Sequence, residues 1–421
     1  MKKIIILIVT FFFIYPIYPK NLPIPIDRVY QIIGFGLLIF SSKDLTKIII
    51  SKYFNKYIGA SLILLFLSFL PQIWVKGGYD FYFIKRVLNI FLEILSGYVV
   101  YWFIKRYYKT VTLGTVLNYI VLAAIIQVII SMFFFIKPHY YDLYYSYLNE
   151  DVENKDFSEM VAMLQVRFIG VGSSFFNGIN KYGIAFFAAL ILPHVHKGFL
   201  TSNKILYWFS VLIVFMGGML TGRTFFIAIA LGLLMITLLK SKTILGFAMQ
   251  NIKFIFLFVP FLFIIYFILS ALIDVHQLER VFNYVFELFL NYFSGQGLQS
   301  RSTNAQIGMY VFPDSVNTWL FGDGRMQALT GGYYMGSDIG YVRLIFYFGL
   351  PATLFFVYLL YKYFRILSGL ANYKPLTYFF FTIFLWFIIL NFKGLAFHSY
   401  YFSMFILVLV LTTKSKFKLK I

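Results

Sequence analysis

The sequence predicts an all-α integral membrane protein with about twelve transmembrane helices, and its composition is the first reason. Of its 421 residues, 61% are apolar and only 12% are charged, and the mean hydropathy is +0.82. Soluble globular domains contain roughly 45–50% apolar and about 25% charged residues. The chain has no cysteine, which excludes disulfides, thiol nucleophiles and cysteine-ligated zinc or iron–sulfur sites.

Twelve apolar runs of roughly the length that a membrane-spanning helix requires are the second reason. They cover residues 4–19, 26–42, 57–75, 84–104, 111–136, 174–193, 205–221, 224–239, 253–273, 339–361, 376–392 and 397–413. The first run resembles a signal peptide, but no small-residue cleavage site follows it, so we count it as a span. We expect the chain, 1–421, to form a single integral membrane domain.

The basic residues orient these spans, because lysine and arginine in short loops stay on the cytoplasmic side. With the N-terminus inside, 21 of the 36 basic residues fall in the inner segments, beside one acid, Asp44. We therefore expect both termini to be cytoplasmic. This topology and anionic lipid account for the net charge of +20, so nucleic acid is not an expected partner.

Two outward segments are too long to be simple turns. These are the third outer loop, 137–173, after the fifth span, and the fifth outer loop, 274–338, after the ninth. An acidic run at 150–159 favours a solvated loop over a cation site. Residues 278–289 place four apolar side chains on one helical face, which predicts a helix along the outer membrane–water interface. The four are Val281, Val285, Leu288 and Phe289.

The choice between lysine and arginine is the most informative feature of the charged residues. Lysine supplies most of the inner charges, whereas eight of the ten arginines lie in outward loops or toward the membrane. A guanidinium group holds phosphate or carboxylate in a planar, bidentate manner, while an ammonium group acts as a point charge. We therefore expect an anionic ligand at the outer leaflet. The eight are Arg28, Arg86, Arg167, Arg223, Arg280, Arg301, Arg325 and Arg343.

Arg223 and Arg343 are the sharpest of these candidates. Arg223 lies in the sequence Gly-Gly-Met-Leu-Thr-Gly-Arg-Thr at 217–224, between two apolar runs, where the glycines would let a ligand approach closely. A charge at the membrane edge is costly unless it faces a polar cavity or the interface, which favours a site residue over a snorkelling loop residue. Arg343 lies one turn inside the tenth predicted span, five residues after Asp338. That pair forms either a site or a local structural contact.

The sequence lacks the usual motifs of nucleotide and metal chemistry. There is no Walker loop, no GxGxxG after a strand, no HExxH and no Asp-x-Asp. His194 and His196 are two residues apart and do not share a helical face, so no metal is expected there. His398 opens the last predicted span from the outside, where it either lines a cavity or anchors the helix. The outer-loop tyrosines suit sugar faces, but tyrosine is also enriched at membrane interfaces, and we leave them unassigned.

The predicted topology and two local segments resemble the O-antigen polymerase (Wzy-type) family and its O-antigen ligase relatives. The segments are Thr-Gly-Arg at 221–223 and Asp-Ile-Gly-Tyr-Val-Arg-Leu at 338–344. The polymerases have Arg-x10-Gly motifs in the same two outer loops. At that spacing, this sequence has Arg167 with Gly178 and Arg325 with Gly336.

A third pair at this spacing, Arg86 with Gly97, runs into a predicted span, and we interpret it as a coincidence.

The resemblance implies a GT-C-like glycosyltransferase without metal or cofactor, in the bacterial cytoplasmic (inner) membrane. Its substrates would be undecaprenyl-pyrophosphate-linked oligosaccharides, polymerised into O-antigen or capsular polysaccharide, with membrane lipid and a chain-length regulator as further partners. Arginines at the outer edge would neutralise the departing pyrophosphate. The catalytic candidates are Arg223, Arg325, Arg343 and Asp338, the last as general base, with Asp323 and His398 in reserve. The substrate-binding candidates are Arg167, Gly178, Arg301, Gly336 and His398.

Two other functions stay open. An O-antigen ligase, which transfers the finished polysaccharide to a lipid A core, has the same topology and donor. It is expected to use a histidine in the large outer loop, where this sequence has only His276. A flippase for lipid-linked oligosaccharides, or another transporter, also commonly has twelve spans but shows repeat symmetry and charges in mid-span. Here the predicted spans are nearly uncharged apart from Glu93 and the Lys85–Arg86 pair.

Overall fold

The described helices form two compact units. The computed structural model describes residues 2–75, 78–108, 110–148, 163–172, 175–240, 260, 263–264, 266–297, 299–329, 331–396 and 400–412. Unit 1 comprises residues 1–9, 30–116 and 306–421, and unit 2 comprises residues 10–29 and 117–305. In the described ranges the regular structure is helical, with two isolated β-bridges. The expected single integral membrane domain stays a prediction.

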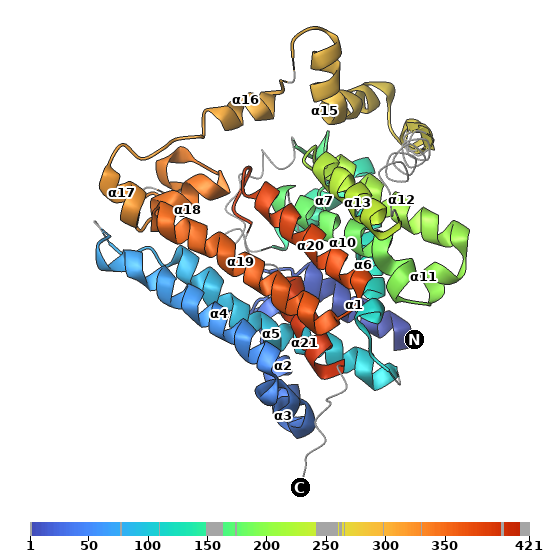
Figure 1. The fold of residues 1–421 in the computed structure, drawn as a ribbon. Helices are drawn as coiled ribbons and strands as arrows, with labels where there is room; N and C mark the ends of the chain where they lie inside the picture. Colours follow the sequence, from blue (N-terminus) through green and yellow to red (C-terminus); the bar gives the residue numbers. More distant parts are fainter. Residues whose placement is uncertain are drawn as a thin grey trace. The chain divides into compact units, whose positions relative to one another are not determined.

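The helices of each unit have the following bounds (Figure 1). In unit 1 they are α3 (Ser42–Ile50), α4 (Lys52–Phe69), η1 (Leu70–Ile73), α5 (Tyr82–Tyr107), α17 (Val316–Phe321), η2 (Tyr334–Gly336), α18 (Gly340–Phe348), α19 (Leu350–Ala371), α20 (Lys374–Leu390) and α21 (Tyr400–Thr412). In unit 2 they are α7 (Pro138–Ser146), α10 (Phe175–Val195), α11 (Phe199–Ser202), α12 (Lys204–Thr221), α13 (Phe225–Lys240) and α15 (Val275–Phe293). Others begin in one unit and end in the other: α1 (Lys2–Ile14), α2 (Ile26–Phe40), α6 (Leu113–Ile136) and α16 (Arg301–Ile307).

Within the described residues, six helices are long and apolar enough to cross a membrane. They are α4 with η1, α5, α6, α10, α12 and α19. The 24 residues of α6 extend about 36 Å at 1.5 Å per residue, which exceeds the roughly 30 Å of a bilayer core. These helices indicate a multi-pass membrane protein. The apolar helices α13, α20 and α21 are shorter.

The first predicted span, 4–19, is wrong in its extent. Helix α1 begins at Lys2 and ends at Ile14, after 13 residues. Pro16 lacks a backbone N–H and disfavours helical geometry at the residue before it, so the helix stops although the apolar run continues.

The tenth predicted span, 339–361, is also wrong, because the structure divides it into α18 and α19. Gly349, between the two helices, has φ of +79°, a left-handed conformation that glycine adopts at little cost. A Cβ atom at this position would lie 2.4 Å from the carbonyl oxygen of Leu320. Arg343 therefore lies in the short helix α18 and not inside the span-length helix α19.

Replacing Gly349 by alanine is expected to destabilise the protein, because the substitution combines a left-handed backbone with a clash against Leu320. The conformation alone, with positive φ and extended ψ, costs roughly 1–3 kcal/mol for a residue with a Cβ atom. The matched control is Gly59→Ala in α4, where a Cβ atom meets nothing within 4 Å and alanine favours the helix. Thermal unfolding of the purified protein in detergent should show a lower Tm for Gly349→Ala only; equal Tm values would contradict this account.

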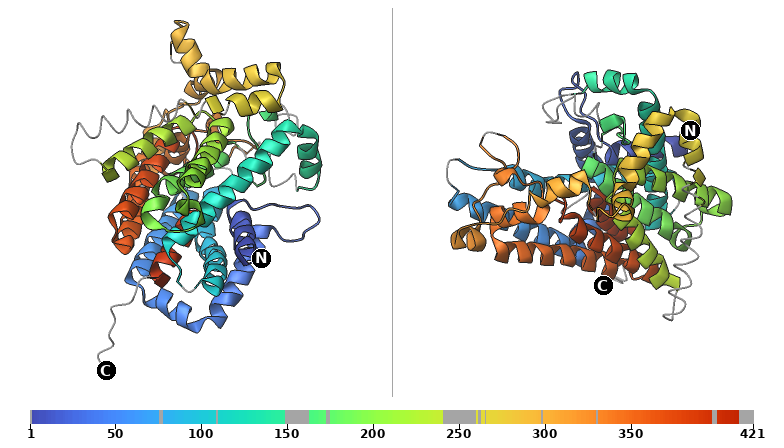
Figure 2. Two further views of the ribbon diagram at one scale, coloured as in Figure 1. Left: turned by 90° about the vertical axis from the view of Figure 1, so that its right-hand side faces the viewer. Right: turned by 90° about the horizontal axis from the view of Figure 1, so that it is seen from above.

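The core of unit 1 brings together helices that lie far apart in the sequence. Helices α4 and α19 run side by side, as do α19 and α20 (Figures 1 and 2). The hydroxyl oxygens of Ser61 in α4 and Tyr363 in α19 lie 3.0 Å apart and share a buried hydrogen bond. Helix α5 packs against α21 so closely that a Cβ atom on Gly97 would lie 3.1 Å from the Cα atom of Met404.

The last turn of α5 is tied to α3 by a buried carboxylate. Lys105 Nζ lies 2.7 and 2.8 Å from the two carboxylate oxygens of Asp44, and the Tyr98 hydroxyl donates to the same group at 3.0 Å. Asp44 is 3% exposed. Asp44 therefore has a structural role at the C-terminal end of α5, whereas Tyr82 begins the helix at its N-terminal end.

In unit 2, α10 is buried along most of its length and packs against α12 and α13. The predicted amphipathic helix is present as α15, capped by Asp274, whose Oδ1 accepts from the Gln277 N–H at 2.8 Å. Its buried face consists of Leu278, Val281 and Val285. Phe289, predicted on that face, is 43% exposed, and its ring centroid lies 5.3 Å from that of Phe226 in α13.

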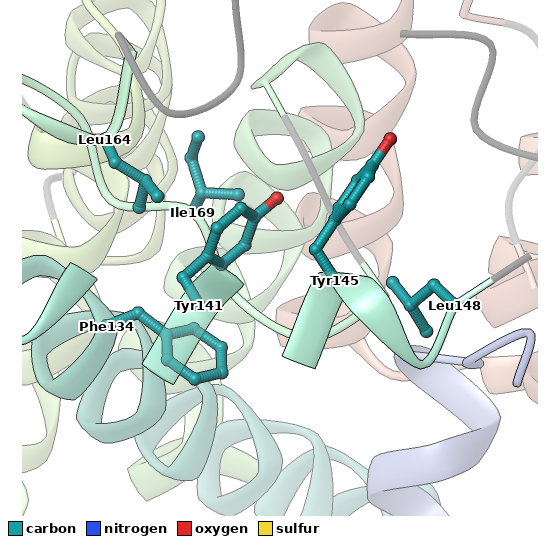
Figure 3. Close-up of a cluster of buried hydrophobic side chains, with 6 residues drawn as sticks. All are labelled: Phe134, Tyr141, Tyr145, Leu148, Leu164 and Ile169. Carbon is teal, nitrogen blue, oxygen red and sulfur yellow. The ribbon is translucent and has the colours of Figure 1, made fainter. Parts of the chain in front are cut away.

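The described part of the third outer loop packs around an aromatic cluster (Figure 3). Its buried members are Phe134, Tyr141, Tyr145, Leu148, Leu164 and Ile169. Tyr141 and Tyr145 are therefore core residues, whereas Tyr140 and Tyr147 are exposed. The acidic run at 150–159 lies outside the described residues.

Candidate functional site

Arg223 lies in the turn between α12 and α13 and is 8% exposed. The glycines beside Arg223 let neighbouring side chains pack closely. They do not leave the space for a ligand that the sequence led us to expect. A Cβ atom on Gly222 would lie 2.5 Å from Ile179 Cδ1, and one on Gly218 would lie 2.2 Å from the Phe225 ring. The side chains of Ile179 and Phe225 fill the space beside these glycines, so the turn is closely packed and holds the Arg223 backbone in place.

The guanidinium group of Arg223 contacts α15. It forms an ion pair with Glu287, and its carbon Cζ lies 4.7 Å from the centroid of the Tyr284 ring. Tyr284 and Glu287 are three residues apart, so they share one face of the helix. The Glu287 side chain is 22% exposed, so the pair lies at the border between interior and solvent.

Arg167 reaches the same tyrosine from the third outer loop. Its Cζ atom lies 4.5 Å from the Tyr284 ring centroid and 5.5 Å from that of Phe175. The next residue, Phe168, donates its N–H to the carbonyl oxygen of Leu220 at 2.9 Å, which fixes this loop to the end of α12. Two arginines 56 positions apart in the sequence thereby converge on one ring.

We call Arg167, Arg223, Tyr284 and Glu287 the α15 cluster. Burial raises the pKa of the Tyr284 hydroxyl, although the two neighbouring arginines favour its ionised form. The tyrosine is therefore neutral near pH 7, and the four side chains carry two positive charges and one negative charge. Two guanidinium groups that converge on one ring are suited to accept a phosphate or carboxylate, whose oxygens they bind through planar, bidentate hydrogen bonds.

Unit 1 contains a separate group of predicted site residues around α18. Arg343 is 4% exposed, and its Cζ atom lies 4.5 Å from the Tyr333 ring centroid and 5.5 Å from that of Tyr82. Asp338 contacts Tyr333: burial raises the pKa of this tyrosine, and the charge of Asp338 raises it further. We call Tyr82, Tyr333, Asp338 and Arg343 the α18 cluster.

Arg325 lies in the loop before α18 and is 8% exposed. Its Nη2 atom lies 3.4 Å from the carbonyl oxygen of Gly78. Asp80 fixes this loop, since its Oδ2 accepts from the N–H groups of Met326 and Gln327 at 2.6 and 2.8 Å. Its Oδ1 accepts from the Tyr82 N–H at 2.9 Å. One carboxylate thus connects the start of α5 with the residues beside Arg325.

Other predicted site residues take different places. Asp323, a reserve base, accepts from Thr318 Oγ1 at 2.7 Å and from the Tyr334 hydroxyl at 3.1 Å, which indicates a structural role. Gly178 is buried inside α10. Gly336 has φ of +66°, in a turn that favours glycine.

Two predicted residues cannot be placed. Arg301 begins α16, and its side chain lies outside the described part of the structure, as does the whole of His398.

Sequence reasoning missed Tyr284, Glu287, Tyr82 and Asp80. A signal existed for Glu287, because an acid three residues after a tyrosine on an amphipathic helix can face a basic loop. For Asp80, the only signal in the sequence was the presence of an acid between two apolar runs. Comparisons with protein families, with curated proteins and with solved structures found no match, so the interpretation of both clusters depends on their own chemistry.

Proposed function

We propose that the protein polymerises undecaprenyl-pyrophosphate-linked oligosaccharide repeat units into O-antigen or capsular polysaccharide at the outer face of the bacterial cytoplasmic membrane. The observation that carries the proposal is the α15 cluster, in which Arg167 and Arg223 share the Tyr284 ring and Arg223 forms an ion pair with Glu287. Two guanidinium groups beside an amphipathic helix suit a pyrophosphate held at a membrane surface.

The reaction requires stabilisation of a leaving group more than it requires covalent chemistry by the protein. A hydroxyl oxygen of the acceptor sugar forms a bond to the anomeric carbon of the donor chain. The bond from that carbon to the pyrophosphate oxygen breaks, and the pyrophosphate leaves with the electron pair. Guanidinium groups that are already in place stabilise this charge in a partly water-excluded site.

The hydroxyl proton passes to a base. Asp338, the base that the sequence predicts, belongs to the α18 cluster of unit 1 and not to the α15 cluster. Twelve spans, a GT-C-like fold, cytoplasmic termini and a chain-length regulator as partner belong to the same proposal.

Two observations bear on the alternatives. His276, the histidine of the fifth outer loop, is exposed at the second position of α15 and makes no described contact with the α15 cluster, which favours a polymerase over a ligase. Glu93 is buried inside α5 with 9% exposure. A carboxylate within a spanning helix is a feature of transporters, so a flippase is the second candidate.

The proposal is tested by comparing gels of surface polysaccharide from a strain that lacks the gene and from the complemented strain. We expect the ladder of polymer to collapse to a single repeat unit on its lipid carrier. Polymer that persists on the carrier but never reaches its final acceptor would instead identify a ligase. Failure of single repeats to appear at the outer face would favour the flippase.

A further inference from the structure

Two arginines, one exposed and one buried, lie against the ring of Tyr82 at the start of α5. The Cζ atom of Arg86 lies 4.7 Å from the ring centroid, and that of Arg343 lies 5.5 Å from it. Arg86 follows Tyr82 by one helical turn, and its Nη2 atom donates to the Tyr82 hydroxyl. The two guanidinium carbons are therefore separated by no more than the sum of these distances.

No carboxylate forms an ion pair with either arginine in the described part of the chain. The Lys105–Asp44 and Arg223–Glu287 ion pairs involve other side chains. Asp80, which lies close in the sequence, uses both oxygens to accept backbone N–H groups. Like charges on the two guanidinium groups repel each other, and the repulsion is stronger where water is partly excluded. Asp338 supplies one negative charge to the α18 cluster through its contact with Tyr333, and an external anion would compensate the remaining positive charge of the two arginines.

Arg343 has hydrogen-bonding capacity that the protein does not use. Its Nε atom is buried and has no hydrogen-bond partner among the described residues. Its Nη2 atom reaches the carbonyl oxygen of Met326 only at 3.5 Å, a long distance for a hydrogen bond. Buried donors without partners are rare in proteins. The unused donor suits the oxygens of a phosphoryl group, which guanidinium groups bind in a bidentate manner.

Aromatic side chains before Tyr82 indicate a membrane surface. Tyr79 is 71% exposed and Phe81 is 45% exposed, with ring centroids 5.7 Å apart. Trp74, earlier in the same connection, is 41% exposed. Exposed aromatic residues at the end of a spanning helix are typical of the headgroup region of a bilayer. A phosphoryl group at this depth is more readily supplied by a lipid than by bulk solvent.

We infer that Tyr82, Arg86 and Arg343 form a binding site in unit 1 for a phosphoryl group carried by a membrane lipid. The exposed guanidinium of Arg86 receives the ligand, and the buried guanidinium of Arg343 supplies the unused donor. A phospholipid headgroup and a prenyl diphosphate share this chemistry. The choice of the prenyl diphosphate as occupant rests on the proposed function, whereas the site itself does not.

The test uses the full-length protein in nanodiscs of phosphatidylcholine, with geranylgeranyl diphosphate as the probe and native mass spectrometry to count the molecules bound. We expect two per wild-type chain, one at each arginine cluster, and one per chain for Arg86→Ala. Loss of a charge-assisted hydrogen bond should lower affinity at this site about tenfold or more. Arg86→Lys should weaken binding less than Arg86→Ala does.

A matched control is Arg365→Ala. Arg365 also follows a tyrosine, Tyr361, by four residues and lies 5.8 Å from its ring centroid. In the described residues no second arginine lies over that ring, so two bound molecules are expected to remain. Arg86 is exposed, so its removal should leave the Tm unchanged. Two molecules bound to Arg86→Ala at wild-type affinity would overturn the inference.

Further arms identify the source of the phosphoryl group. Geranylgeraniol, which lacks phosphate, should not bind at this site. Occupancy by phosphatidylglycerol as tight as that by the diphosphate would identify an ordinary headgroup and overturn the assignment to a prenyl diphosphate. Inorganic pyrophosphate that binds as tightly as the prenyl form would overturn the lipid requirement.

The Arg223→Ala variant separates this inference from the proposed function. It should lose the molecule at the α15 cluster and keep the one at Arg86 and Arg343. A wild-type protein that binds a single probe, lost in Arg223→Ala but kept in Arg86→Ala, would refute the present inference alone. The reverse pattern would refute the α15 cluster as the pyrophosphate site of the proposed polymerase.

Discussion

Replacing Arg223 by lysine is expected to reduce the rate of polymer formation by about a hundredfold or more, the usual effect of removing one preorganised donor from a transition state. Lysine keeps a positive charge for Glu287, so the ion pair can persist. It loses the planar guanidinium group, which binds phosphate in a bidentate manner and lies over the Tyr284 ring. The measurement is the initial rate of polymer formation from lipid-linked repeat units in isolated membranes.

The matched control is Arg106→Lys. Arg106, in the last turn of α5, lies 5.9 Å from the Trp102 ring centroid, outside either cluster. This variant should retain the wild-type rate, and both variants should show the wild-type amount of inserted protein. A wild-type rate for Arg223→Lys would show that a point charge suffices and would refute the bidentate role of Arg223.

Replacing Asp80 by alanine should destabilise the protein strongly and also lower activity. The substitution removes the acceptor for the backbone N–H groups of Tyr82, Met326 and Gln327. Each hydrogen bond to a charged group contributes roughly 1.5–3 kcal/mol, so we expect a loss of about 3 kcal/mol or more in the free energy of unfolding. Thermal and denaturant-induced unfolding in detergent measure this change.

Asp80→Asn and Asp314→Ala complete the experiment. Asparagine keeps one carbonyl oxygen as acceptor, so this variant should fall between wild type and Asp80→Ala. Asp314 is an exposed acid in the fifth outer loop, and its removal should leave the Tm unchanged. If Asp80→Ala unfolds at the same temperature as Asp314→Ala, the carboxylate does not hold the loop as we describe.

The helical fold could be predicted from the sequence because long apolar runs are local signals. Residues 111–136 and 205–221 correspond closely to α6 and α12. The end of α1 and the break at Gly349 could not be read from hydropathy, since the surrounding residues are uniformly apolar. Pro16 and the contact of Gly349 with Leu320 decide these boundaries.

The site was predictable only in part. The preference for arginine on the predicted outward side led to Arg223 and Arg343, because residue choice is visible in the sequence. The grouping of Arg167 with Arg223 depends on Tyr284, 61 positions beyond Arg223, and on the backbone bond from Phe168 to Leu220. Such pairings arise from tertiary packing and leave no local pattern. The function itself stays a prediction.

The close packing of α5 against α21 has a consequence for biogenesis. Gly97 has Met404 as its nearest neighbour, and Ser403 donates a hydrogen bond to the carbonyl oxygen of Ile90. Roughly 300 residues separate these partners, and ribosomes add about 5–20 residues per second. Helix α5 therefore stays without its final neighbour for about 15–60 s after its own synthesis. During this interval the insertion machinery or lipid must cover the face of α5 that contains Gly97.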